Sequence, residues 1–380
     1  MVILFCRKSL FLLATLVFHF CLAGKVEAQC PTCFYPGSSW DSIDREQLGS
    51  MGWSEDKMSD LNAFVRDSTN LTGLFIVDQG HKVLEFGDVA ELSYVASVRK
   101  SILSLLYGKW VENEVINLDW TIEELGISDI GGLLPIERRA TIRDLLTAKS
   151  GVYHSASNDG DNLADAPERG TKEPGSYMLY SNWDFNVAGT VFEQLTGNNI
   201  YEELERQLAI PLRFEDWDRS AQQKMGDPSL SIHPAYHMWL STRDLARIGL
   251  LMLSEGNWNG EQVIPQSWHR TITRLETPLI EMNPSYMRER YLGYGYMWWL
   301  WDGPQSRGPF EGAFTAAGAY GQWITVLPAV HLVIATKTKY AYRRRTSWAQ
   351  YERMIELIFE SRNIDEGIDY PWNKATLDIK

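Results

Sequence analysis

The segment GQWITVLPAVHLVIATKT, residues 321–338, carries two strand-like runs near the end of the chain. Gly321–Leu327 and Leu332–Thr338 are rich in β-branched and other apolar residues, which favour strands. Pro328-Ala329 provides a turn between them. The segment therefore predicts two consecutive strands.

Similar strand signals occur further from this segment. Gly73–Asp78 and Lys82–Phe86 are short β-prone runs around Gln79-Gly80-His81, a hairpin pattern, and Gly293–Trp301 is also strand-like. Helical periodicity marks Asp56–Asp67 and Thr346–Arg362, which are amphipathic. Strands near both ends with helices between them predict an α+β fold, in which both termini complete one antiparallel sheet flanked by helices.

The middle of the chain has a different pattern. From Ser97 to about Glu281 it is mostly helical, broken by a Gly-, Asp- and Asn-rich stretch from Ser150 to Gly175 that we interpret as a loop. We therefore expect two regions. Residues 29–96 and 290–380 would form the sheet domain, residues 97–289 an inserted helical domain, and the active site would lie between them.

Composition excludes several classes of protein. The chain has 380 residues, of which 44% are hydrophobic and 22% are charged, as in folded globular proteins rather than disordered ones. The formal net charge of −13 does not favour binding to nucleic acid, which requires clustered Lys and Arg. We therefore expect a small-molecule or peptide partner rather than nucleic acid.

The first 28 residues resemble a signal peptide. Arg7 and Lys8 precede an apolar run from Leu10 to Gly24, and Val26-Glu27-Ala28 has the pattern of a cleavage site. The run is shorter than the roughly 18 apolar residues that a membrane helix needs, so we expect no stable membrane anchor. The sequence predicts cleavage near Ala28 and a secreted or periplasmic protein.

Two cysteines would remain after cleavage. Cys30 and Cys33 form Cys-Pro-Thr-Cys, and in an oxidising compartment such a pair can form a small local disulfide. A redox function is not favoured, because redox motifs of this kind open a helix after a strand, whereas this one lies in a Pro- and Ser-rich leader. Whether the two thiols pair is left open by the sequence.

Ser97-Val98-Arg99-Lys100 begins a predicted helix whose apolar positions place Ser97 and Lys100 together on another face. A serine hydroxyl needs a base to become a good nucleophile, and a lysine in a desolvated pocket can serve as one. The backbone N–H groups at a helix N-terminus can also stabilise an oxyanion. The alternative is structural: Ser97 caps the helix and Lys100 is solvated.

Tyr180-Ser181-Asn182 follows Pro174-Gly175 and lies where the loop gives way to a helical pattern. A phenol at this corner can share a proton with Lys100 and pass it between Ser97 and a leaving group. The Asn182 amide can orient a substrate carbonyl or the lysine. The alternative for Tyr180 is a core tyrosine with a satisfied hydroxyl.

These two motifs in this order resemble the serine β-lactamase and penicillin-binding-protein superfamily, whose signature is Ser-x-x-Lys. The likeness is closest to the class C β-lactamase-like branch, which includes esterases, D-amino-acid peptidases and nylon-oligomer amide hydrolases. Thr141–Val152 and Ser241–Arg247 are also similar to that branch. The resemblance implies that Ser97 is a nucleophile, that Lys100 and Tyr180 transfer protons, and that Asn182 positions the substrate.

The third motif of the family departs from its usual form. Where penicillin-recognising members carry Lys-Thr-Gly, the corresponding stretch here is Thr315–Gln322, without Lys or His. Lys337-Thr338-Lys339 lacks the glycine and comes a strand too late. The backbone around Gly318, Ala319 and Tyr320 can still supply an oxyanion N–H. The cation for a substrate carboxylate is absent from this motif, so we expect neutral esters to be preferred over β-lactams.

Other chemistries have little support in the sequence. Gly-x-Ser-x-Gly and His-Glu-x-x-His are both absent, and Pro234 argues against a helical zinc pair of His233 and His237. We therefore expect neither a cofactor nor a metal. The sequence predicts an exported serine hydrolase that cleaves a small-molecule ester, amide or peptide through an acyl-enzyme on Ser97. The alternatives are a D-amino-acid peptidase, or a penicillin-binding-like protein that binds cell-wall peptides or β-lactams with weak or no turnover.

Overall fold

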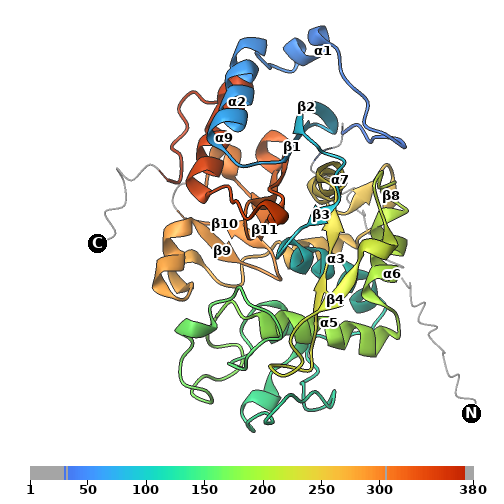
Figure 1. Cartoon of the computed structure of the whole chain (residues 1–380), viewed down its shortest axis with the longest axis vertical. Helices are drawn as coiled ribbons and strands as arrows, with labels where there is room; N and C mark the ends of the chain where they lie inside the picture. Colours follow the sequence, from blue (N-terminus) through green and yellow to red (C-terminus); the bar gives the residue numbers. More distant parts are fainter. Residues whose placement is uncertain (1–29, 31–32, 304–305, 373–380) are drawn as a thin grey trace, which may run out of the picture.

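The computed structural model describes residues 30, 33–303 and 306–372, and its centre is an antiparallel sheet of seven strands (Figure 1). The order of the strands is β2-β1-β13-β12-β11-β10-β9. Their bounds, in chain order, are Gly73–Asp78 (β1), His81–Gly87 (β2), Leu292–Tyr294 (β9), Trp299–Trp301 (β10), Phe314–Gly318 (β11), Gln322–Leu327 (β12) and Leu332–Lys337 (β13).

Both ends of the chain complete this sheet, as the sequence predicts. β1 pairs with β13 in a register that runs from Gly73 opposite Lys337 to Asp78 opposite Leu332. β12 and β13 form the hairpin expected for residues 321–338. All residues of β1, β12 and β13 are buried, because helices cover both faces of the sheet.

The predicted strand Gly293–Trp301 is two strands. β9 and β10 pair with each other, and the chain reverses between them, where the N–H of Gly295 donates to the carbonyl of Trp298. Met297 has a φ of 63°, in the left-handed region. The aromatic and apolar pattern hides this reversal, because Gly295 is the only turn-favouring residue of the turn Gly295–Trp298 and its central residues, Tyr296 and Met297, have no turn preference.

Helices cover the two faces of the sheet. α9 (Trp348–Ser361) lies on one face, where the Tyr351 hydroxyl donates to Thr325 Oγ1 at 2.6 Å, and α2 (Glu55–Ser68) packs against α9. α7 (Thr242–Leu253) covers the other face. Gly249 permits this close approach, because a Cβ there would lie 2.2 Å from Cγ1 of Val333.

Of the remaining elements, α1 lies at the top of Figure 1, α3, α6 and β8 lie on its right side, and α5 and β4 lie below the sheet. The helices are α1 (Arg45–Ser50), α3 (Val98–Glu112), α4 (Ile142–Leu146), α5 (Asn182–Thr196), α6 (Ile200–Leu204) and α8 (Gln266–Ile272). Short strands form two-stranded sheets: β3 (Ser93–Tyr94) with β6 (Trp239–Leu240), β4 (Gln223–Met225) with β5 (Ala235–His237), and β7 (Asn257–Trp258) with β8 (Glu261–Gln262).

The region predicted as helical, residues 97–289, therefore also contains strands, and its helix α7 packs on the main sheet. The long loop from Ser150 to Gly175 is confirmed, with a single short turn of 3-10 helix at Leu163–Asp165. The two-domain boundaries stay a prediction.

The N-terminal expectations fall partly outside the described residues. The predicted signal peptide, residues 1–28, lies there. Cys30 and Cys33 are joined by a disulfide. Among the described residues, no helix combines the length and the apolar character needed to cross a membrane.

Candidate active site

Ser97 lies at the N-terminus of α3, and Lys100 lies one turn into the helix. The Ser97 hydroxyl makes no capping hydrogen bond, and Lys100 Nζ donates to Ser97 Oγ at 3.0 Å. Residue Ala96, just before the nucleophile, has a φ of 49°, a conformation that costs energy for a residue with a Cβ. The sharp entry into α3 leaves the Ser97 hydroxyl in contact with the Lys100 side chain instead of capping a backbone N–H of the helix.

Lys100 is 1% exposed, because α3 is buried on all sides over Val98–Gly108. Burial is the main cause that holds the pKa of Lys100 well below its usual range, and the neighbouring positive charge of Arg99 acts in the same direction. A lowered pKa makes it easier for Lys100 to lose its own proton and so to act as a base toward the Ser97 hydroxyl. Its burial excludes the solvated-lysine alternative.

Tyr180 completes this polar group from the loop before α5. Lys100 Nζ donates to Tyr180 Oη at 2.6 Å. Burial raises the pKa of Tyr180 to about 12, although a hydrogen bond with Ser97 partly offsets the effect. The phenol is therefore protonated near neutral pH. Tyr180 can pass a proton on, while Lys100 is the group able to act first as a base.

The end of β11 approaches the N-terminus of α3. A Cβ on Gly318 would lie 2.7 Å from the carbonyl oxygen of Val95 and 3.1 Å from the Ser97 nitrogen, so only glycine allows this approach. Ala319 and Tyr320 follow in a turn in which Tyr320 has a φ of 72°. The N–H groups of Ser97 and Ala319 have no hydrogen-bond partner within the part of the chain that the structure describes. Their placement suits a two-donor oxyanion site.

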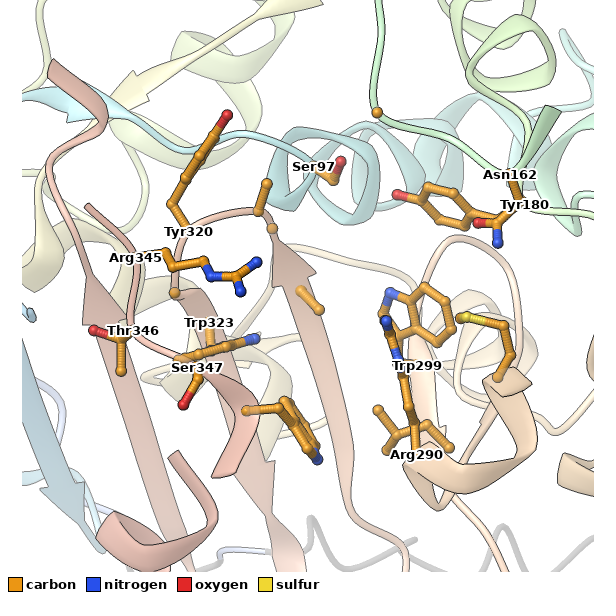
Figure 2. Close-up of a pocket in the computed structure, with 18 residues that line it drawn as sticks. Ser97, Asn162, Tyr180, Arg290, Trp299, Tyr320, Trp323, Arg345, Thr346 and Ser347 are labelled. Carbon is orange, nitrogen blue, oxygen red and sulfur yellow. The ribbon is translucent and has the colours of Figure 1, made fainter. Parts of the chain in front are cut away.

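A cavity of about 430 Å³ opens in front of these groups (Figure 2). It joins Ser97 and Tyr180 to the loop Gly318–Tyr320, and three tryptophans form much of its wall. The lining residues beyond Ser97, Tyr180 and Gly318–Tyr320 are Gly160, Asn162, Met287, Arg290, Leu292, Trp299, Ala317, Gly321, Trp323, Arg345, Thr346, Ser347 and Trp348. Ser97 and Tyr180 thus meet at a space large enough for a small molecule, and Lys100 contacts both hydroxyls without lining that space.

Comparison with known proteins identifies the family. A sequence profile of the Beta-lactamase family matches residues 77–354, which include the whole site. The chain belongs to the beta-lactamase family. Its sequence is also 25% identical over 260 residues to an uncharacterized protein of Alkalihalophilus pseudofirmus, covering 63% of this chain and 71% of that protein.

Solved structures share this fold at low sequence identity. A Bacillus anthracis protein assigned as a 6-aminohexanoate-dimer hydrolase has a TM-score of 0.60 and 19% identity, with 90% of each chain covered. The hydrolase EstCE1, which has promiscuous acyltransferase activity, has a TM-score of 0.56 and 16% identity, covering 85% of this chain and all of that one (100%). Likeness at such identity shows the fold alone.

In this beta-lactamase family member, Asn182 does not reach the cavity. Asn182 is 1% exposed, and its side-chain amide donates to the carbonyl of Asp159 at 2.8 Å. Its backbone N–H donates to Asp161 at 2.9 Å. Asn182 therefore holds the loop at residues 158–161 against the start of α5, while its Oδ1 is buried without a partner among the described residues. Its predicted substrate-positioning role stays a prediction.

Asn162, which the sequence did not single out, occupies the wall of the cavity instead. Its backbone N–H donates to the carbonyl of Tyr180 at 2.9 Å, and its side-chain amide donates to the Tyr286 hydroxyl at 2.7 Å. No motif marks it, because it lies in the long loop Ser150–Gly175. Its place at the site becomes visible only in the folded protein, where it bonds to Tyr180 and Tyr286.

Two cations line the cavity, although the third motif on β11 carries none. Arg290 and Arg345 both line the cavity. They come from the segments that precede β9 and α9, not from the third motif on β11. The third motif therefore lacks a cation, as the sequence shows, but the cavity as a whole has two.

Metal ligands do not gather in the described part of the chain. Among those residues, no group of three or more His, Cys, Asp or Glu side chains is placed to hold a metal ion. His233 is buried, and its ring nitrogens contact Thr190 Oγ1 and the carbonyl of Ser128.

Proposed function

We propose that this protein is an exported serine hydrolase that cleaves an ester or amide through an acyl-enzyme on Ser97. The observation that carries the proposal is the position of Lys100 Nζ, 3.0 Å from Ser97 Oγ and 2.6 Å from Tyr180 Oη. A buried amine between two hydroxyls can take a proton from one and exchange it with the other. Membership of the beta-lactamase family supports this chemistry.

The first half of the reaction forms the acyl-enzyme. Neutral Lys100 takes the proton of Ser97 as Oγ attacks the substrate carbonyl carbon. The carbonyl oxygen becomes an oxyanion and accepts hydrogen bonds from the N–H groups of Ser97 and Ala319. The proton then passes from Lys100 through Tyr180 to the leaving oxygen or nitrogen, whose bond to the acyl carbon breaks.

The second half releases the product. A water molecule gives a proton to the Lys100 and Tyr180 pair and attacks the acyl carbon. The bond to Ser97 Oγ breaks, Oγ recovers a proton, and the acid leaves. The same groups therefore act twice, as microscopic reversibility requires of one proton path.

Export is part of the proposal and rests on two features. The signal-peptide pattern of residues 1–28 predicts it. The disulfide between Cys30 and Cys33 supports it, because such bonds persist in oxidising compartments.

Labelling with a fluorophosphonate probe tests the nucleophile. Ser97→Ala should abolish labelling, because the probe needs an activated serine oxygen. Ser267→Ala, in an exposed serine on α8, is the matched control and should label like the wild-type protein. Labelling of Ser97→Ala at the wild-type rate, with both variants melting at the wild-type temperature, would contradict the assignment.

Turnover separates a hydrolase from a binding protein with the same fold. A panel of p-nitrophenyl esters and anilides should show repeated release of product per labelled site. If acylation stops after one equivalent and the acyl-enzyme persists, the protein captures its ligand without releasing it, and the binding-protein alternative holds.

A further inference from the structure

Two guanidinium groups on the cavity wall are unpaired. Arg290 and Arg345 line the cavity, and neither side chain has a hydrogen-bond or ion-pair partner among the described residues. Several arginines elsewhere are paired: Arg169 and Arg362 each contact a buried carboxylate, and Arg247 contacts the partly buried Glu215. An arginine left without a partner at the edge of a reaction cavity is available to an anionic ligand.

The surroundings of these two side chains make the charge more significant. No Asp or Glu is among the described residues that line the cavity, although the whole chain has a net charge of −13. The lining therefore carries two cations and no carboxylate. The Asp161 carboxylate, which acts on Lys100 and Tyr180, accepts the backbone N–H of Asn182 and is not part of the lining. Unpaired cations on a concave wall attract anions.

Arg345 is fixed at its backbone and free at its side chain. The carbonyl of Arg345 accepts a hydrogen bond from the Asn70 amide at 2.9 Å. The next residue, Thr346, donates its N–H to the carbonyl of Tyr320 at 3.0 Å. This bond connects the segment to the turn at Ala319 and Tyr320. Figure 2 shows Arg345 on the same side of the cavity as Tyr320 and Trp323. The exposed guanidinium of Arg345 therefore lies on the wall of the cavity that also contains Ser97, and it has no partner among the described residues.

Tryptophans supply much of the apolar part of the cavity wall. Trp299 stacks on Tyr180 with ring centroids 5.4 Å apart, Trp323 lies on the side of Arg345 in Figure 2, and Trp348 contacts Trp323. Met287 and Leu292 add further apolar surface. Such walls favour a flat or aliphatic body and offer it no second charge.

We propose that the substrate is an ester or amide with an apolar body and a carboxylate, and that Arg345 binds this carboxylate with Arg290 as the secondary cation. This inference rests on the proposed hydrolase function. It also reverses the preference for neutral esters that the third motif alone predicts, since the missing lysine on β11 is replaced by an arginine from the segment before α9.

A matched pair of esters tests the proposal. The probes are mono-p-nitrophenyl adipate, which carries a free carboxylate, and its methyl ester, which has the same acyl chain without the charge. The wild-type protein should show a kcat/KM for the acid roughly 10- to 150-fold above that for the methyl ester, the range of a hydrogen bond to a charged group. The ratio should fall as salt concentration rises, because part of the attraction is long-range.

Three variants locate the effect. Arg345→Gln should bring the ratio of the two kcat/KM values close to one, and Arg345→Lys should keep part of the preference, because an ammonium keeps the charge but not the bidentate geometry. Arg290→Gln should lower the ratio less. Arg344→Gln is the matched control: Arg344 is exposed and lies outside the cavity lining, so the ratio should remain at the wild-type value.

The outcomes separate this inference from the function on which it rests. If the wild-type protein hydrolyses both esters through Ser97 and the ratio is near one, or if Arg345→Gln leaves a high ratio unchanged, carboxylate binding by Arg345 is refuted and the hydrolase stands. If neither ester is cleaved and Ser97 is not labelled, the hydrolase itself is refuted, and the inference with it.

Discussion

Two buried lysines in this protein have similar electrostatics and different surroundings. Lys100 on α3 and Lys337 at the end of β13 are 1% and 2% exposed. Burial is the largest cause of a lowered pKa in both, and it brings the pKa of Lys337 to about 7. Lys100 contacts the hydroxyls of Ser97 and Tyr180. Lys337 contacts the backbone carbonyls of Glu91 and Leu240.

The difference shows what makes a buried amine useful to a reaction. A hydroxyl can both give and take a proton, whereas a carbonyl oxygen can only accept a hydrogen bond. Lys100 does not itself line the cavity, but its partners Ser97 and Tyr180 do, whereas Glu91 and Leu240, the partners of Lys337, do not. A lowered pKa alone therefore does not identify a catalytic lysine; its partners and its access do.

The largest effect should separate the two lysines directly. Lys100→Ala should lower kcat by roughly 10² to 10⁴, because it removes a positioned acid/base. Lys337→Met, which keeps the apolar volume, should leave kcat near the wild-type value. The measurement is steady-state hydrolysis of a p-nitrophenyl ester by both variants, after thermal melting has shown that each is folded. An equal loss in both would mean that the contrast between their partners has no bearing on catalysis.

A smaller effect tests whether the partners of Lys100 form one proton path. Tyr180→Phe alone should also lower kcat by roughly 10² to 10⁴. Added to Lys100→Ala, it should cost less than about tenfold more, because groups that act as a unit are not additive. A double variant that shows the full product of the two single losses would indicate that Tyr180 acts independently of Lys100.

The sequence predicted the candidate nucleophile and its proton-transfer partners, but it did not predict the two arginines that line the cavity. The reason is physical. Ser97 and Lys100 lie one helical turn apart, so local periodicity already placed them together. Tyr180 needed only its motif at a loop-to-helix corner. Arg290 ends a 3-10 helix and Arg345 lies just before α9, and no local pattern in the sequence predicts that both line one cavity. Asn182 matched the motif, yet its amide is bound by the carbonyl of Asp159.

The same division applies to the fold. The hairpins β1–β2 and β12–β13 were predicted because apolar runs and turn residues are local signals. The reversal between β9 and β10 was missed, because Tyr296 and Met297 give no turn signal and their burial is set by contacts with α3. Ser101 and Ser104 of α3 donate to the carbonyls of Met297 and Tyr296, so this turn is stabilised by a distant element.

The smallest expected effect concerns Lys337 and the stability of the fold. The pKa of Lys337 is lowered to about 7 in the folded protein, whereas in the unfolded chain this lysine has its ordinary, higher pKa. At pH values between these two pKa values, the unfolded chain therefore binds more protons than the native one. The free energy of unfolding should therefore rise with pH in this window, by about 1 kcal/mol between pH 7.5 and 8.5 from this group. Lys337→Met removes that contribution, so its advantage over the wild-type protein should shrink as pH increases. Urea unfolding of both proteins at the two pH values measures the difference. A constant difference would mean that Lys337 keeps an ordinary pKa in its buried position, and that the electrostatic likeness to Lys100 is not real.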